Sequence, residues 1–300
     1  MIRVPQDLHP PGTCGGTPTG VCVTPGCAGA ERAEDRLQGG GGVTGFLMDM
    51  LIFAFGAAVG SFLNVCIYRL PAEQSIVRPG SRCPQCLTPI RWYDNLPLLS
   101  FLILRGRCRA CAAVVSWRYP AVEGLAALLA LLLFWKYGLG AAFLAAFAFT
   151  AALIAVTFID IDHQIIPDVI SLPGIPLGFL LAVFAMRVPW LEALLGLLLG
   201  GGVLYAIAVA YELATKREGM GGGDIKLLAM IGAFLGWKSL IFILLVSSLT
   251  GAAVGIALMV AKGADTKYAV PFGPFLSLAA VAYLFFGAAF FNFLMFHRFF

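Results

Sequence analysis

Long apolar stretches recur along this chain of 300 residues and restrict what it can fold into. Hydrophobic residues make up 60% of the sequence and charged residues only 12%, whereas about a quarter of a soluble domain is charged. A helix that crosses the hydrocarbon core of a bilayer needs about 20 apolar residues. The pattern therefore predicts an all-α polytopic membrane protein with about eight transmembrane helices.

The apolar stretches give the order of the predicted spans and the division of the chain. We expect spans at residues 46–67, 121–137, 139–159, 169–187, 190–212, 225–237, 239–261 and 273–294. The predicted parts are a disordered N-terminal extension (1–45), the first transmembrane helix (46–68), a polar insert (69–119) and a seven-helix transmembrane domain (120–300).

The N-terminal extension differs in composition from everything that follows it. Residues 1–45 are rich in Gly, Pro and Thr, and they lack the apolar segment of a signal peptide. Such a stretch cannot bury a core, so we expect it to be disordered. Met48 or Met50, close to the first apolar run, could be the natural start, with the extension as an upstream addition.

The polar insert carries most of the information on orientation. It contains eight arginines against Glu73 and Asp94, a net charge of +6. Because cytoplasmic loops of membrane proteins carry the excess of Lys and Arg, we expect the insert to face the cytoplasm. Alternation of the spans then assigns the loops near 160–168, 213–224 and 262–272 to the same side.

Two cysteine pairs lie within the insert, Cys83-Pro-Gln-Cys86 and Cys108-Arg-Ala-Cys111, with 21 residues between them. Two such pairs are typical of a four-cysteine zinc ribbon. The alternative is a set of disulfides or redox pairs, which a reducing cytoplasm disfavours. Since four thiolates leave no open position on the metal, the predicted zinc is structural, and it would stabilise an insert too small for a large core.

Four aspartates gather at the predicted cytoplasmic boundary: Asp160, Asp162 and Asp168 near the end of the third span, and Asp224 before the sixth. A charged side chain near the membrane interior is costly and is by default a functional hypothesis. For Asp162 and Asp168 we prefer a structural interpretation, as interfacial carboxylates or helix caps.

Asp224 follows a glycine run, and the apolar helix after it is short. Ile225 to Gly236 is 12 residues, about 18 Å of helix, against a hydrocarbon core of ~30 Å. We expect Asp224 to lie in a cavity, with the glycines forming unwound backbone there. Two carboxylates that share a proton can activate water and polarise a peptide carbonyl, so Asp160 and Asp224 are the candidate catalytic pair.

Several stretches together resemble the bacterial prepilin leader peptidases, which are bifunctional enzymes of type IV pilus and type II secretion systems. The stretches are GSFLNVCIYRLP (60–71), the two cysteine pairs with DNLPLLSFL between them, SWRYPAVE (116–123), IDIDHQIIPD (159–168), GMGGGDIKLLAMIGAFLG (219–236) and PFGPFLSLAA (271–280). They extend over nearly everything from residue 46 to the end of the chain.

The resemblance implies a G-x-G-D intramembrane aspartic protease, with Gly221 to Asp224 as its signature. It also selects Asp160 over Asp162, because the other catalytic aspartate of the family stands six residues before an Ile-Pro pair. The implied localisation is the bacterial inner membrane, multi-pass, with the active site toward the cytoplasm. The implied partners are prepilin and pseudopilin substrates and the lipid bilayer, with no nucleic acid.

The implied reaction is cleavage of a short basic leader after a glycine, followed by N-methylation of the new N-terminus with S-adenosylmethionine. No glycine-rich nucleotide fingerprint is present, so the sequence does not indicate which residues bind the methyl donor. Glu123, at the entry to the second span, is a candidate for methyl transfer. We interpret it instead as a helix-start carboxylate favoured by the helix dipole.

Two other classes of protein fit part of the sequence. A proton- or ion-coupled transporter would also carry acids in membrane helices, but near mid-bilayer and often within inverted repeats. A membrane-anchored methyltransferase without peptidase activity would need the cysteine-containing insert but not the two aspartates.

Overall fold

The structure is a computed structural model that describes residues 43–216, 221–262 and 271–296. The chain divides into two units, Met1–Met48 and Asp49–Phe300. Of the first unit only residues 43–48 are described, as the start of the first helix. The predicted disorder of the extension therefore falls outside the described residues, apart from residues 43–45, which are helical.

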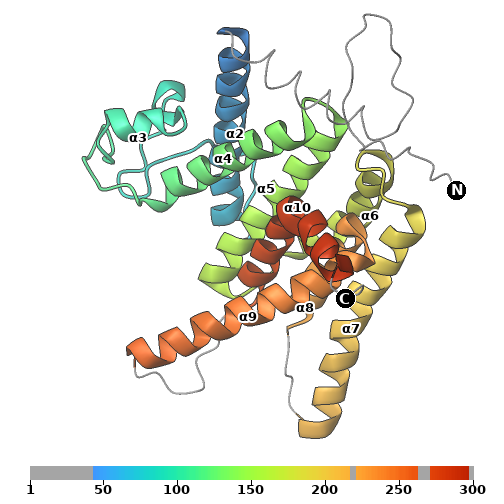
Figure 1. Cartoon of the computed structure of the whole chain (residues 1–300). Coiled ribbons are helices and arrows are strands. Elements are labelled where there is room, and N and C mark those ends of the chain that lie inside the picture. Colours follow the sequence, from blue (N-terminus) through green and yellow to red (C-terminus); the bar gives the residue numbers. More distant parts are fainter. Residues whose placement is uncertain (1–42, 217–220, 263–270, 297–300) are drawn as a thin grey trace, which may run out of the picture. The chain divides into compact units, whose positions relative to one another are not determined.

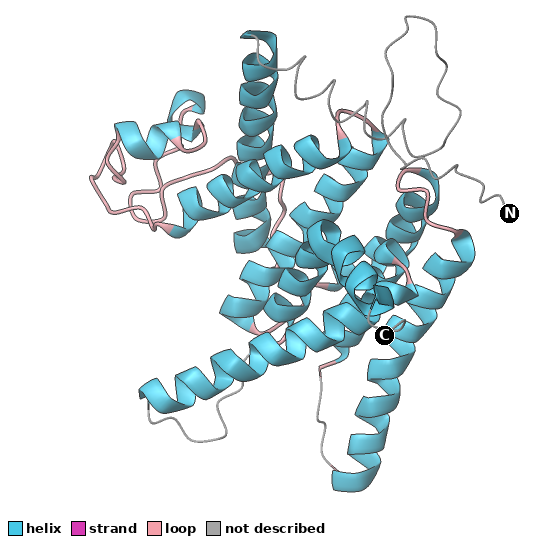
Figure 2. Cartoon of the chain, in the orientation of Figure 1, coloured by secondary structure: helices cyan, strands magenta, loops and turns pink. Residues whose placement is uncertain are grey.

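The described part of the chain is built from helices and loops (Figures 1 and 2), with two isolated β-bridges in the insert. The helices are α2 (Val43–Arg69), η1 (Trp92–Asn95), α3 (Leu99–Ile103), α4 (Arg118–Tyr137), α5 (Ala141–His163), α6 (Asp168–Phe184), α7 (Trp190–Thr215), α8 (Gly222–Leu235), α9 (Trp237–Lys262) and α10 (Gly273–Phe296).

The predicted class, an all-α polytopic membrane protein, is confirmed. Each of the eight predicted spans corresponds to a helix, with bounds that differ by at most a few residues. By length and composition, six of the described helices could cross a membrane: α2, α4, α5, α7, α9 and α10. The other two are shorter, α6 with 17 residues and α8 with 14.

Helix α8 lies in the interior of the protein. Every side chain from Leu227 to Phe234 is buried, and α8 contacts α6, α7, α9 and α10. A helix that is apolar on all sides is one that other protein elements surround. Because protein rather than lipid covers α8, this helix does not have to be long enough to cross the hydrocarbon core.

Glycines bring α7 and α8 into close contact. A Cβ atom on Gly196 of α7 would collide with the carbonyl oxygen of Gly232 in α8, and a Cβ on Gly232 would collide with that of Gly196. Small residues at such a crossing let two helix backbones approach closely and pack without a hydrophobic driving force between them. The position of α8, and of the aspartate in its first turn, depends on this contact.

We predict that Gly196→Ala and Gly232→Ala each destabilise the protein by about 1–3 kcal/mol, because the added methyl group has no space. The measurement is thermal unfolding in detergent. Gly202→Ala, on the same helix α7 but with open space around its Cβ position, is the matched control and should be neutral or slightly stabilising. Equal changes in melting temperature for all three variants would contradict the proposed packing role.

Candidate active site and metal centre

Three of the four predicted aspartates, Asp160, Asp168 and Asp224, line one cavity. Asp160 lies in the last turn of α5, and Asp224 is in the first turn of α8. The cavity has a volume of about 280 Å³ and is also lined by Gln164, Ile165, Ile166, Gly221 and Gly223. The fold thus brings together two carboxylates that are far apart in the sequence.

A backbone amide holds the Asp160 carboxylate in place. Asp160 is only 5% exposed, and its Oδ2 accepts a hydrogen bond of 3.0 Å from the N–H of Gly273, the first residue of α10. A Cβ atom on Gly273 would lie 2.6 Å from this oxygen. Sequence analysis assigned no role to Gly273; its only signal was the Pro-Phe-Gly-Pro stretch at residues 271–274.

The glycines before Asp224 differ from expectation. We predicted unwound backbone, but Gly222 and Gly223 form the first turn of α8, and Gly221 is the extended residue before it. The prediction of unwound backbone was wrong for these two glycines. Gly222 has open space around its Cβ position, whereas Gly223 is needed for close packing. A Cβ on Gly223 would lie 2.9 Å from the Cβ of Ile166, which packs against this turn. Gly219 and Met220 lie outside the described residues.

The two other aspartates have cationic partners. Asp162 forms an ion pair with Arg118, and both carboxylate oxygens of Asp168 accept hydrogen bonds from the Lys226 ammonium, at 2.7 and 2.9 Å. Among the described residues, no Lys or Arg forms such a pair with Asp160 or Asp224. Of the four aspartates at this face, the two without an ion pair are therefore those that the sequence marked as the candidate catalytic pair.

The four cysteines of the insert form a compact cluster. The sulfur atoms of Cys83, Cys86, Cys108 and Cys111 all lie within 4.8 Å of one another, and those of Cys83 and Cys111 are 3.7 Å apart. A tetrahedral metal with metal–sulfur bonds of ~2.3 Å, as in zinc sites, separates its ligand sulfurs by about 3.8 Å. A disulfide would require a sulfur–sulfur distance of about 2.05 Å. The spacing of the four sulfurs therefore fits the ligands of a tetrahedral metal.

Two similar turns present these sulfurs. In the first, the N–H of Leu87 donates to the carbonyl of Cys83 (2.9 Å) and the N–H of Cys83 donates to that of Thr88 (3.0 Å). The second turn repeats both bonds: the N–H of Ala112 donates to the carbonyl of Cys108 (2.9 Å), and the N–H of Cys108 donates to that of Ala113 (2.8 Å). Leu87 and Ala112 both have positive φ angles, of 57° and 56°. The insert thus holds both cysteine pairs in the same backbone conformation.

Hydrogen bonding in the first turn favours the metal-binding form of cysteine. The hydroxyl and backbone of Thr88 lower the pKa of the Cys86 thiol to about 6. The Cys86 Sγ and Thr88 Oγ1 atoms are 3.3 Å apart. Because the thiolate is the species that binds metal, this turn prepares Cys86 as a ligand near neutral pH.

The insert is also fastened to the helices. Glu123 is in the second turn of α4 and is buried, and its Oε2 accepts a hydrogen bond of 2.8 Å from the N–H of Leu98 in the insert. Where the insert ends, Asn64 of α2 donates a hydrogen bond of 3.1 Å to the carbonyl of Tyr119 in the first turn of α4. Our interpretation of Glu123 as a helix-start carboxylate was wrong, because its partner is this amide and it lies beyond the first turn.

Comparison with known proteins matches two regions of the chain. Residues 54–137 match the family model of the bacterial peptidase A24 N-terminal domain, and residues 147–256 match that of the type IV leader peptidase family. A protein of Aeromonas salmonicida named prepilin leader peptidase/N-methyltransferase is 41% identical, with 76% of this chain and 87% of that protein aligned. The chain belongs to the type IV leader peptidase family. It is therefore a multi-pass membrane protein of a bacterial family.

Further relatives of the same name support this membership. Those of Pseudomonas putida and Neisseria gonorrhoeae are 40% and 38% identical, each with 76% of this chain and 87% of the relative aligned. No solved structure matches the chain. The second matched region includes Asp160 and Asp224 but ends before Gly273.

We predict that the purified protein contains about one metal ion per chain, bound by the four insert cysteines. Elemental analysis provides the measurement. Cys83→Ser and Cys108→Ser should each lose the metal, because three thiolates and a hydroxyl bind it far more weakly. Cys66→Ser is the control, since Cys66 is buried in α2 outside the cluster. A metal-free wild-type protein, or metal loss in Cys66→Ser, would contradict the assignment.

Proposed function

We propose that this protein is a prepilin leader peptidase and N-methyltransferase. It cleaves the short basic leader from type IV prepilins and type II secretion pseudopilins at the cytoplasmic face of the bacterial inner membrane. It then methylates the new N-terminal amine with S-adenosylmethionine. The observation that carries the peptidase proposal is the cavity lined by both Asp160 and Asp224, and the names of the relatives support both activities.

The two carboxylates divide the work of peptide hydrolysis. One is ionised and takes a proton from a water molecule, which attacks the carbonyl carbon of the scissile bond. The other is protonated and donates a hydrogen bond to the carbonyl oxygen, where negative charge develops. The N–H of Gly273 fixes the Asp160 carboxylate, so that one of the two groups does not have to be reoriented during the reaction.

The location of the acids supports a peptidase over a transporter. Asp160 and Asp224 occupy terminal turns of α5 and α8, where an extended peptide could reach them. A transporter would more commonly place its acids near mid-bilayer. A methyltransferase without peptidase activity would leave the shared cavity without a role.

Zinc is the metal that we assign to the cysteine cluster, with a structural role. Cys83, Cys86, Cys108 and Cys111 would occupy all four positions of a tetrahedral ion, which leaves none for water or substrate. When bound, the zinc cross-links the two cysteine turns. We accordingly assign residues 69–119 to a zinc-binding insert and residues 120–300 to the peptidase domain.

The direct test is incubation of the purified full-length protein with a prepilin peptide, with and without S-adenosylmethionine, followed by mass spectrometry. Leader removal in both samples, with an added methyl group only in the second, is the expected result. A methylated peptide that keeps its leader would contradict the peptidase proposal. A cleaved peptide that never gains a methyl group would contradict the methyltransferase proposal.

We predict that Asp160→Asn and Asp224→Asn each lower the rate of leader cleavage by about 10²–10⁴-fold, the contribution of general acid–base catalysis. Asp162→Asn and Asp168→Asn are matched controls at the same face. They should remain within about tenfold of wild type, because partly exposed ion pairs contribute little stability. The assignment fails if either member of the candidate pair tolerates the change or if Asp162 proves essential.

We further predict that Gly273→Ala lowers the cleavage rate by about 10-fold to 10²-fold, because the methyl group would displace the Asp160 carboxylate. Gly255→Ala, with open space around its Cβ position in α9, is the control. Cleavage rates and melting temperatures of both variants distinguish a displaced carboxylate from an unfolded protein. Full activity in Gly273→Ala would mean that the amide contact does not position Asp160.

A further inference from the structure

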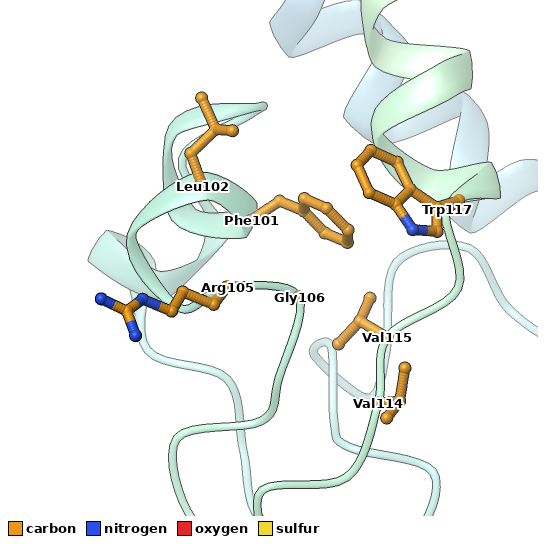
Figure 3. Close-up of a pocket in the computed structure, with 7 residues that line it drawn as sticks. All are labelled: Phe101, Leu102, Arg105, Gly106, Val114, Val115 and Trp117. Atoms are coloured by element: carbon orange, nitrogen blue, oxygen red, sulfur yellow. The ribbon is translucent and has the colours of Figure 1, made fainter.

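A second cavity lies in the insert, outside the aspartate site. It has a volume of about 250 Å³, and its walls include Phe101 of α3, Val114 and Val115 after the second cysteine turn, and Trp117 at the start of α4. In Figure 3 the rings of Phe101 and Trp117 approach each other from two separate segments, with Val115 beneath them. We refer to this space as the aromatic cavity.

Large apolar side chains around the aromatic cavity are uncovered. Trp117 is 76% exposed and Val114 is 79% exposed. The ring centroids of Phe101 and Trp117 are 4.8 Å apart, with their planes inclined at 59°, so the two rings are not stacked in parallel. Each ring retains surface on which a flat ligand could stack.

The chemistry of these walls favours a particular class of ligand. Aromatic faces stack on purine bases, with about 1–3 kcal/mol lost per base when the ring is removed. Their negative quadrupole also attracts cations, which include a sulfonium group. The aromatic walls therefore match a ligand with an adenine ring. A sulfonium group fits only over the ring faces, because Arg105, which also lines the cavity, carries a positive charge. S-adenosylmethionine has both groups.

The aromatic cavity is also connected to the aspartate site. Trp117 directly precedes Arg118, whose guanidinium forms an ion pair with Asp162 and donates a hydrogen bond of 3.0 Å to the Phe158 carbonyl. Phe158 and Asp162 lie on either side of Asp160 in the last part of α5. One wall of the aromatic cavity is thus fastened to the helix segment that carries a proposed catalytic aspartate.

We propose that the aromatic cavity binds the adenine ring of S-adenosylmethionine against Phe101 and Trp117. The inference rests on the proposed function, which requires a methyl donor. In the reaction, the neutral amine nitrogen of the cleaved peptide attacks the methyl carbon. The N–C bond forms as the S–C bond breaks, sulfur keeps the electron pair and leaves as S-adenosylhomocysteine, and the new ammonium releases a proton to solvent.

The test measures binding without turnover. Isothermal titration calorimetry of S-adenosylhomocysteine is performed on the full-length protein in nanodiscs, without peptide. Trp117→Ala should weaken binding by about 10-fold or more, since it removes one stacking face, whereas Trp117→Phe should retain most of the affinity. Trp92→Ala is the matched control, because Trp92 is 80% exposed in the same insert but does not line the aromatic cavity.

Two further measurements make the result decisive. Photo-cross-linking with an azido-adenosyl analogue of the donor should label a peptide that contains Phe101 or Trp117. Metal content and melting temperature of Trp117→Ala should match those of wild type, which excludes an unfolded insert as the cause.

The inference is overturned if Trp117→Ala binds the product with unchanged affinity, or if the label lies elsewhere. It is also overturned if Trp117→Ala and Trp92→Ala weaken binding equally, a result that points to contact between the insert and lipid instead. These outcomes differ from failure of the proposed function, in which the wild-type protein neither cleaves nor methylates a prepilin peptide.

Discussion

The enclosure of residues 227–234 of α8 by other helices is the constraint on which the candidate active site depends. A helix of 14 residues is too short to cross a bilayer on its own, and its first backbone amides would be left without partners in lipid. It is surrounded by helices α6, α7, α9 and α10. Its first turn can therefore line a cavity instead of contacting lipid. That arrangement lets Asp224 face Asp160 while the apolar remainder of α8 fills the core.

Three of the four aspartates are held by contacts between distant segments. Gly273 contributes its amide to Asp160 from 113 residues away in the chain. Arg118 connects the start of α4 to the end of α5, and Lys226 connects α8 to the start of α6. Because these contacts satisfy Asp162 and Asp168, two carboxylates of the four remain available for chemistry. Tertiary contacts therefore determine which of the four aspartates are available for catalysis.

Sequence analysis predicted those features that depend on local pattern. The helices follow from long apolar stretches, and the four-cysteine cluster follows from ligand spacing. The role of Gly273 could not be predicted, since nothing near residue 273 indicates which helix its amide will meet. Gly223 was misinterpreted for a related reason. A glycine that permits an unusual backbone angle and one that makes room for Ile166 look alike in a sequence. The pairing of Phe101 with Trp117 has no periodic signal at all.

When a metal joins them, the two cysteine turns also restrict the conformational freedom of the chain segment between them. Cys86 and Cys108 enclose 21 residues, which include η1, α3 and Phe101. Cross-linking the ends of such a segment removes loop freedom from its unfolded ensemble, and this favours the folded insert without any added contact inside it. The order of one wall of the aromatic cavity is therefore linked thermodynamically to the occupancy of a metal site that does not touch it. Asp160 and Asp224, carried by α5 and α8, lie outside this closed loop. Metal binding therefore stabilises the insert without ordering the segments that carry the two aspartates.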